Sequence, residues 1–342
     1  MIRNLFSSAC SAIKSFFSGL MQIPAWIRQQ ITCARGNFAS LRRKLNDLTG
    51  SNMELGIYHL YEQNFYDAIF RFKMVDKFLK PGDAAANYWL GWVYLLRREH
   101  KKSIICLSKA DKADEVGLLP FVKSIDSVSI IPDAICALHR DIIANKFTDK
   151  IPVGKVSTDK TNSKTENLPK SLVLALNEAI TELPDKYSIL ELGSNIGLLS
   201  YEINKRMQES YDLTGVEASS RMINLQQEES YDKTIHSSVN SFLSKCSDQY
   251  DVIVSLEGLA FVAKLEDIFS KIHSILKPNG YFAFSIPVLD KNIFLDKSLE
   301  FAYNKPDIEH QLKKNGFNIV SISEINLEIK NNYSIFVCTK RI

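Results

Sequence analysis

The second half of the chain alternates short apolar runs with segments in which apolar residues recur at helical spacing. The apolar runs predict strands near 188–192, 213–217, 233–236, 251–255 and 281–286. The segments between and after them predict helices near 196–208, 219–228, 239–246, 264–276 and 307–315. Two last apolar runs, 317–329 and 333–339, predict a closing hairpin. Strands that alternate with helices indicate an α/β, doubly wound parallel sheet whose ligand binds at the carboxyl edge.

Residues 51–147 have a different pattern, typical of packed helices. Gly56, Ala68 and Phe72 recur 35 positions later as Gly91, Ser103 and Leu107. Such an echo predicts a repeated helix pair, with small residues where the helices touch and large ones between them. Two repeats form a marginal stack, so we expect further helices from 1–47 and 117–147 to complete it. This domain either offers a groove for a protein partner or only braces the domain that follows.

The N-terminal segment, residues 1–50, is basic and amphipathic. Its apolar residues recur at helical spacing, and it carries no acidic side chain before Asp47. Three interpretations remain open: a helix that caps the domain behind it, a peripheral membrane contact through residues 1–30, or a cleaved targeting signal. Apolar runs here are too short to span a bilayer.

Composition narrows the remaining choices. The chain has 342 residues, 45% hydrophobic and 24% charged, with a net charge of +3, which suits a globular protein of about two domains. Its basic excess lies in the first segment, so a nucleic-acid partner is not expected. The six cysteines form no CxxC pair, which favours a reducing, cytoplasmic compartment and predicts no metal site. Polar residues 148–168 predict a linker, with the α/β domain at 169–342.

The segment ILELGSNIGLL, residues 189–199, predicts a buried strand, a glycine-bearing turn and a helix. Glycine lets a backbone approach a ligand closely, and amides at a helix N-terminus favour electron-rich ligand atoms. The next predicted strand ends at Glu217, where a carboxylate can accept hydrogen bonds from both hydroxyls of a ribose. Together these features predict a nucleoside-binding pocket.

A nicotinamide-dependent oxidoreductase is an alternative for such a turn. The dinucleotide fingerprint G-x-G-x-x-G has its second glycine where Asn195 stands, and a side chain there would crowd a pyrophosphate. No GK[ST] follows, which argues against a P-loop. Glu191, just before the first glycine, suits the ammonium group of an amino-acid cofactor better than a phosphate.

On these residues the chain resembles the class I S-adenosylmethionine-dependent methyltransferases. More narrowly, it is similar to bacterial predicted methyltransferases that carry tetratricopeptide repeats ahead of the catalytic domain. The resemblance rests on ILELGSNIG (189–197), GVEASSRM (215–222), the run at 250–286 and the helical segment 131–147. It implies a Rossmann-like sheet with an antiparallel last strand, preceded by an all-α tetratricopeptide-like domain, and S-adenosyl-L-methionine as the cofactor.

The resemblance also implies a role for each candidate site residue. These are Glu191, Gly193, Ser194 and Asn195 at the methionine end, Gly197 in tight packing of the turn, Glu217 on the ribose, Ala218 and Asn240 at the adenine, and Glu257 facing the cofactor or acceptor. Simpler explanations exist for three of them: a salt bridge for Glu191, a helix cap for Asn240 and packing alone for Gly197. We name no catalytic base, because a sulfonium is already an activated methyl donor.

The predicted function is methyl transfer to an unidentified acceptor, small molecule or protein, with the helical repeats as an interaction surface. Residues 287–306, which carry Phe294, Phe301 and Tyr303, are expected to shape the acceptor site. Tyr303 stands where relatives often have histidine, and Glu257 is one methylene longer than the expected aspartate. The alternative is a non-catalytic adaptor, in which a degenerate methyltransferase-like domain is a scaffold and the repeats bind a partner.

Overall fold

The computed structural model describes residues 47–145, 163–207, 210–295, 298–326 and 332–340. The chain divides into two compact units, Met1–Leu55 and Gly56–Ile342, which are treated separately. In the first unit the described part is the beginning of one helix, so the predictions for residues 1–46 lie outside the described residues, as do those for 146–162. None of the helices in the described part has the length and apolar character needed to cross a bilayer.

The first part of the described chain is helical. Its α-helices are α3 (Leu48–Tyr61), α4 (Phe65–Met74), α5 (Ala84–Leu96), α6 (His100–Leu107), α7 (Leu118–Lys123) and α8 (Asp133–Ile143), with a π-helical turn at Val75–Leu79. A Cβ placed on Gly56 would lie 2.5 Å from the Phe72 ring, and one on Gly91 would lie 2.4 Å from the Leu107 side chain. The echo in the sequence therefore reflects the same close helix approach made twice. That the pairs are tetratricopeptide repeats remains a prediction.

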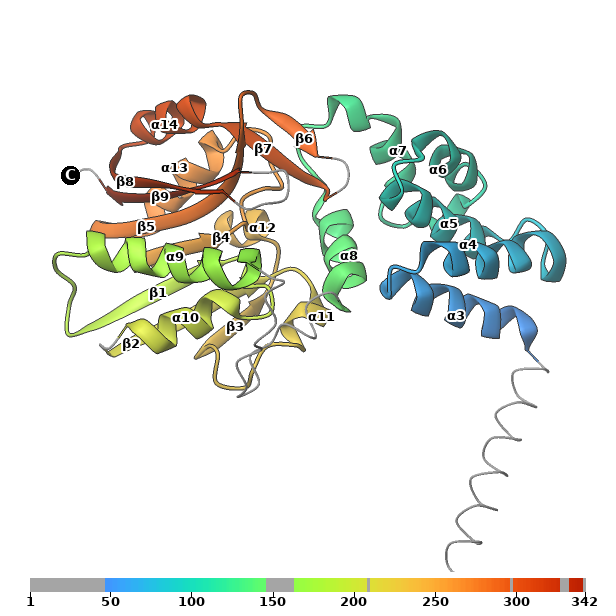
Figure 1. Cartoon of the computed structure of the whole chain (residues 1–342), viewed down its shortest axis with the longest axis horizontal. Coiled ribbons are helices and arrows are strands. Elements are labelled where there is room, and N and C mark those ends of the chain that lie inside the picture. The colour runs from blue at the N-terminus through green and yellow to red at the C-terminus, as the bar shows by residue number, and fades with distance from the viewer. Residues whose placement is uncertain (1–46, 146–162, 208–209, 296–297, 327–331, 341–342) are drawn as a thin grey trace, which may run out of the picture. The chain divides into compact units, whose positions relative to one another are not determined.

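The second part is built on one mixed sheet (Figure 1). Its strands are β1 (Lys186–Leu192), β2 (Ser210–Glu217), β3 (Lys233–His236), β4 (Tyr250–Leu256), β5 (Leu276–Leu289), β6 (Ile293–Leu295), β7 (Glu300–Asn304), β8 (Phe317–Asn326) and β9 (Asn332–Lys340). Strands β3, β2, β1, β4 and β5 lie side by side in that order and are parallel. The last strand, β9, is antiparallel to both β5 and β8, which confirms the predicted Rossmann-like arrangement with an antiparallel end.

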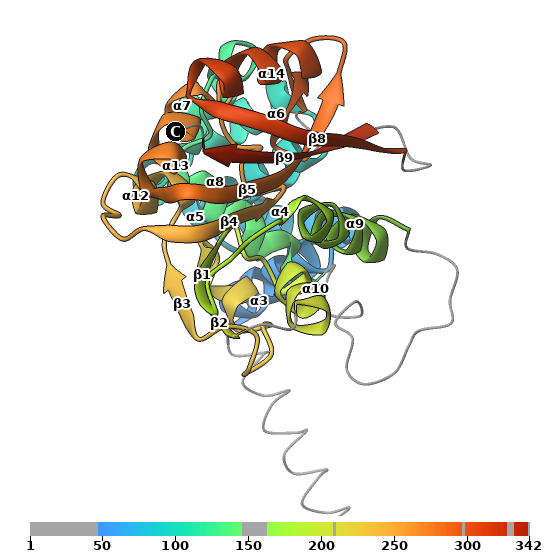
Figure 2. The ribbon, with the colours of Figure 1, turned by 90° about the vertical axis from the view of Figure 1, so that its left-hand side faces the viewer.

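Helices cover both faces of the sheet because its strands alternate apolar side chains between them (Figure 2). On one face α9 (Ser163–Ala179) and α10 (Leu198–Arg206) pack over Ile189, Ala283 and Val337. On the other, Phe269 of α13 (Glu266–Ile275) contacts the rings of Phe282 and Phe284. The neighbouring residues 283 and 284 thus contribute to opposite cores, as expected for an interior strand that is covered on both faces.

Several elements differ from the sequence-based expectation. Helix α9 begins at Ser163, inside the segment expected to be a linker, and β6 and β7 form a hairpin within the stretch expected to shape an acceptor site. Helices α11 (Ser220–Ile223) and α12 (Val239–Leu243) are shorter than predicted, whereas α14 (Lys305–Lys314) lies where it was expected. Residues 277–280, which lie between the predicted helix 264–276 and the predicted strand 281–286, form a bulge inside β5, because Tyr250 pairs with Leu276 and Val252 with Tyr281.

Candidate functional site

The glycine-bearing turn after β1 lies at the carboxyl edge of the sheet, beside the end of β2. The amides of Gly193 and Ser194 both donate to the carbonyl of Val216, at 2.9 Å each. Gly193 has a φ of 79° and packs against Gly258, the second residue after β4. Bare backbone from two strand ends therefore meets at this point, and a ligand here would contact main chain rather than side chains.

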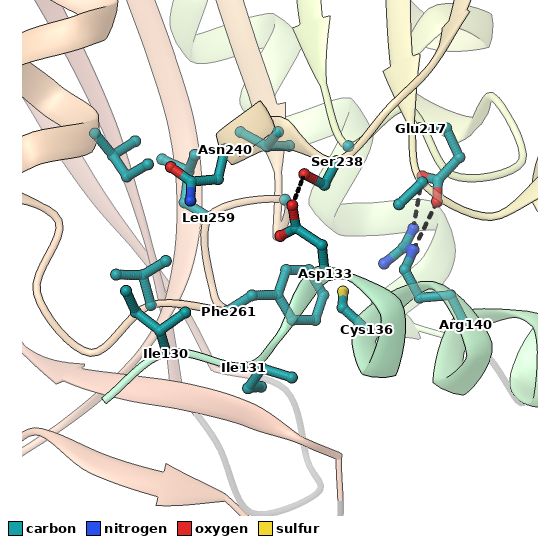
Figure 3. Close-up of a pocket in the computed structure, with 16 residues that line it drawn as sticks. Ile130, Ile131, Asp133, Cys136, Arg140, Glu217, Ser238, Asn240, Leu259 and Phe261 are labelled. Carbon is teal, nitrogen blue, oxygen red and sulfur yellow. Dashed lines mark hydrogen bonds and ion pairs between the residues drawn. The ribbon is translucent and has the colours of Figure 1, made fainter. Parts of the chain in front are cut away.

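Glu217, the last residue of β2, is buried and holds four hydrogen bonds. The amides of Asn195 and Ser219 donate to its carboxylate at 2.8 and 2.9 Å. Arg140 of α8 supplies the other two, from Nε to Oε1 at 2.8 Å and from Nη2 to Oε2 at 3.0 Å (Figure 3). The pair is the parallel, bidentate geometry that makes guanidinium–carboxylate contacts strong.

Helix α8 lies along the edge of the site and is bound to it at both ends (Figure 3). Asp133, in its first turn, accepts hydrogen bonds from the hydroxyls of Ser238 and Ser241, at 2.5 and 2.8 Å. Asp141, in its last turn, accepts from the hydroxyl of Ser219 at 2.5 Å. Arg140 and Asp141 follow Asp133 by seven and eight positions, which is about two helical turns. All three residues therefore lie on one side of the helix. That side is turned toward the ends of β2 and β3.

A cavity of about 50 Å³ lies between α8 and the sheet edge. Its lining is mostly apolar, with Ile131 and Cys136 on the helix side and Ala218, Val239 and Phe261 on the sheet side. Burial raises the pKa of the Cys136 thiol to about 12, so this sulfur is a neutral, apolar part of the wall. Small-molecule sites typically measure about 300–1,000 Å³. The cavity in this arrangement is therefore a fraction of the volume that a nucleoside would need.

The structure brings four of the predicted site residues to this cavity and places five around it. Gly193, Glu217, Ala218 and Asn240 belong to the lining. The remaining five predicted residues, Glu191, Ser194, Asn195, Gly197 and Glu257, are held by other contacts. Asn240 is not the cap of α12, because the Ser238 side chain accepts from the Ser241 amide there; its Oδ1 accepts from Lys271 at 3.3 Å instead.

Glu191 is buried below the turn, and its carboxyl group accepts a 2.8 Å hydrogen bond from the hydroxyl of Tyr231. Burial raises its pKa to about 8, with the charge of Glu217 adding to the effect and the Tyr231 hydrogen bond opposing it. At neutral pH this carboxyl group is therefore mostly protonated in the folded protein. It does not line the cavity.

Other contacts fix the turn itself. The amide of Gln226 donates to the Ser194 hydroxyl at 3.0 Å and to the Asn195 carbonyl at 2.7 Å. Gly197 begins α10 as its N-terminal cap. Glu257, directly after β4, has a φ of 61° and hydrogen-bonds Tyr333. A non-glycine residue in that region of φ is strained, which is common at functional sites.

Tyr303 organises the loop after β4. Its hydroxyl, at the end of a buried side chain, lies 3.0 Å from the carbonyl of Leu259 and 2.7 Å from that of Val262. Leu259, Phe261 and Val262 from this loop all line the cavity. Tyr303 thus positions one wall of the site from behind.

Sequence reasoning missed several residues of the site. Arg140 pairs with Glu217 across 77 positions, and no local pattern encodes such a contact. Gly258 stands two residues after β4 and Tyr231 two residues before β3. Their positions next to strand ends are a signal that could have identified both from the sequence. Among the described residues, no group of three or more His, Cys, Asp and Glu side chains is arranged to hold a metal ion.

The chemistry of the site fits one end of a nucleoside. A buried carboxylate at the end of β2 is a partner for two vicinal hydroxyls, and the apolar lining of Ala218, Val239 and Ile268 suits a flat heterocycle. The closely packed glycines Gly193 and Gly258 lie near Glu217 and offer bare backbone to the rest of the ligand. The guanidinium of Arg140 is the element that does not fit, because it holds the carboxylate oxygens that a ribose would use.

Comparisons with known proteins agree with this geometry. Residues 165–322 match the family model described as Methyltransferase domain. No curated protein sequence matches the chain significantly. The match supports a methyltransferase-type domain for residues 165–322 and does not extend to the helices before it.

Solved structures share the fold at low sequence identity. The [4+2]-cyclase SpnF aligns with a TM-score of 0.50 and 10% identity, over 63% of this chain and 99% of that one. Magnesium protoporphyrin IX methyltransferase (ChlM) from Synechocystis PCC 6803, solved with bound SAH, aligns at 0.44 and 14%, over 59% and 99%. An S-adenosylmethionine-dependent methyltransferase from Clostridium acetobutylicum aligns at 0.41 and 15%, over 58% and 99%. At this identity the likeness to SpnF concerns the fold alone, whereas the methyltransferase-domain model matches residues 165–322 within the second part of the chain.

Proposed function

We propose that the chain is an S-adenosyl-L-methionine-dependent methyltransferase that acts on an unidentified acceptor. The observation that carries the proposal is the buried carboxylate of Glu217 at the end of β2, beside the bare backbone of Gly193 and Gly258. The methyltransferase-domain match over residues 165–322 supports it.

The residues divide the cofactor between them. Glu217 would accept hydrogen bonds from the ribose hydroxyls, while Ala218 and Asn240 would contact the adenine. The methionine end would lie along Gly193 and the turn that follows it, Ser194 to Gly197, with Glu191 below. Glu257, strained and directly after β4, would face the cofactor or the acceptor.

The cofactor supplies a methyl group already activated by its sulfonium. The protein then has to hold the acceptor in line, with reacting atoms roughly 3–3.5 Å apart, and to exclude water. The apolar wall from the loop held by Tyr303 contributes to that exclusion. The hairpin of β6 and β7, with Phe294 against Phe301, would shape the acceptor site.

Titration calorimetry with S-adenosylhomocysteine tests the proposal on the full-length protein. We expect saturable binding at one site, and a loss of at least tenfold in affinity for Glu217→Gln, which removes the charge that strengthens hydrogen bonds to the ribose. Glu202→Gln is a matched control, because that carboxylate pairs with Arg206 on α10. Folded protein that binds neither S-adenosylhomocysteine nor adenosine would contradict the proposal.

A non-catalytic adaptor is the second candidate, and one observation favours it. Arg140 satisfies the very oxygens that the ribose needs, as a degenerate site would. In this case the helical repeats would bind a partner protein, and the second domain would be a scaffold. Capture of the same partner by the full chain and by Glu217→Gln, with no cofactor binding by either, would support the adaptor.

We also infer, from the sequence alone, a cytoplasmic protein with a peripheral membrane contact through residues 1–30 as one further option. Sedimentation of the full chain with anionic vesicles tests that contact. Binding that is lost on deletion of residues 1–30 supports it, and equal binding without them contradicts it.

A further inference from the structure

We infer that helix α8 is an internal lock on the site, in which Arg140 occupies the carboxylate that the nucleoside needs and must leave it before a ligand binds. The inference rests on the proposed function, because it concerns the same Glu217. It adds a closed state and a residue that controls it.

The carboxylate of Glu217 has a limited capacity for hydrogen bonds. An ionised carboxylate offers about four acceptor positions. Glu217 uses two of them for the amides of Asn195 and Ser219, which lie at the same edge of the sheet. It uses the other two for Arg140. A ribose brings two hydroxyl donors, so it takes the positions held by Arg140.

The Arg140–Glu217 ion pair is largely buried. The Glu217 side chain is 1% exposed and that of Arg140 is 11% exposed, so water competes little for either group. Arg140 also lies over the ring of Phe261, at 5.7 Å from its centroid. An arginine on a solvated surface would exchange partners freely, whereas this one is held by a buried carboxylate and an aromatic ring.

Helix α8 is also attached to the site next to Arg140. Asp141, the neighbour of Arg140, accepts hydrogen bonds from the Ser219 hydroxyl and, at 3.3 Å, from the Arg221 amide. It does not line the cavity. Asp141 therefore holds α8 in the closed position without facing a ligand. A substitution at Asp141 can thus distinguish an effect of the helix position from an effect of the Arg140 side chain.

The cavity, at about 50 Å³, is far below the volume of a nucleoside site. Arg140, Cys136 and Ile131 from α8 and its approach form one wall of it. Withdrawal of this wall both enlarges the cavity and frees Glu217. An equilibrium in which the open state is the minor one lowers the apparent affinity in proportion to its population.

The test is calorimetric titration of the full-length protein with two probes, S-adenosylhomocysteine and adenosine. Adenosine carries no charge, so its affinity does not respond to the loss of a positive side chain as such. We expect Arg140→Met to bind both probes at least tenfold more tightly than the unchanged protein. Asp141→Ala should shift both affinities in the same direction by several-fold, and Arg206→Met, which breaks a pair on α10, should shift neither.

The other outcomes are equally informative. Weaker binding of S-adenosylhomocysteine with unchanged binding of adenosine by Arg140→Met would show that the arginine binds the ligand's carboxylate, and would overturn the lock. Equal affinities in all variants would also overturn it while leaving the proposed function intact. Binding of neither probe by any folded variant would overturn both. Arg140→Lys, which keeps the charge but loses the bidentate contact, should fall between the unchanged protein and Arg140→Met.

Discussion

A Cβ atom placed on Gly193 would lie 2.6 Å from the Cα of Gly258. The turn after β1 and the turn after β4 therefore pass each other at a distance that only glycine allows. Gly258 is equally confined, since a Cβ there would lie 2.1 Å from the carbonyl oxygen of Leu192. Both obstacles are backbone atoms, which cannot rotate away.

Alanine at either position should destabilise the protein by about 1–3 kcal/mol or more, because it overpacks the strand ends. Gly82→Ala is the matched control: Gly82 has a φ of 77°, close to the 79° of Gly193, but a Cβ there would meet nothing within 4 Å. Urea unfolding of the three variants measures the effect. If Gly193→Ala lowers the free energy of unfolding no more than Gly82→Ala does, the close approach to Gly258 does not explain the glycine at position 193.

The protonation of Glu191 makes stability depend on pH. Its folded pKa of about 8 lies above the ordinary value of 4.5, so between these values the folded state keeps a proton that the unfolded state has lost. The contribution of Glu191 to the free energy of unfolding is therefore fully present below pH 4.5 and is lost as pH rises toward 8, by about 1.4 kcal/mol per pH unit. Glu191→Gln removes this loss, and its stability advantage should grow between pH 5 and 8.

Urea unfolding of Glu191→Gln and the unchanged protein at each pH unit from 5 to 8 provides the measurement. The glutamine oxygen can still accept from Tyr231, so the comparison isolates the charge. Parallel pH curves would mean that Glu191 is ionised in the folded protein. That result would also remove the argument that burial dominates its environment.

Tyr303→Phe should loosen the loop that forms one wall of the site. The hydroxyl it removes is buried against the carbonyls of Leu259 and Val262, so the expected cost is about 1–3 kcal/mol. Tyr211→Phe loses a hydroxyl that donates to Asn204 at an exposed position and should cost less. Thermal unfolding compares the two, and an equal cost would show that the buried contacts do not matter.

Much of the fold was predictable because its signals are local. The parallel strands β1 to β5 are apolar runs in the sequence. Gly193 directly follows β1 and Glu217 ends β2, so predicting these strands also located both residues. Helix α9 was missed although Leu168, Leu172 and Leu176 recur at helical spacing, because polar residues before them resemble a linker. Residues 277–280 have turn chemistry, yet β5 continues across them as a bulge.

The site was predictable only in part because its remaining residues depend on long-range contacts. Arg140 reaches Glu217 only after α8 docks on the sheet edge, and nothing near residue 140 specifies that partner. The prediction that Glu191 lies at the cofactor rested on its neighbours in the sequence, and these could not reveal its partner in the structure, the hydroxyl of Tyr231 forty positions away. Local patterns located the strand ends, and tertiary packing decided which side chains face the cavity.

A crystal structure of the full-length protein with S-adenosylhomocysteine tests the central claim most directly. The account predicts both ribose hydroxyls within hydrogen-bonding distance of the Glu217 carboxylate, at roughly 2.5–3.0 Å, with Arg140 withdrawn from it. A bound nucleoside elsewhere on the molecule, with the Arg140–Glu217 pair intact, would contradict it.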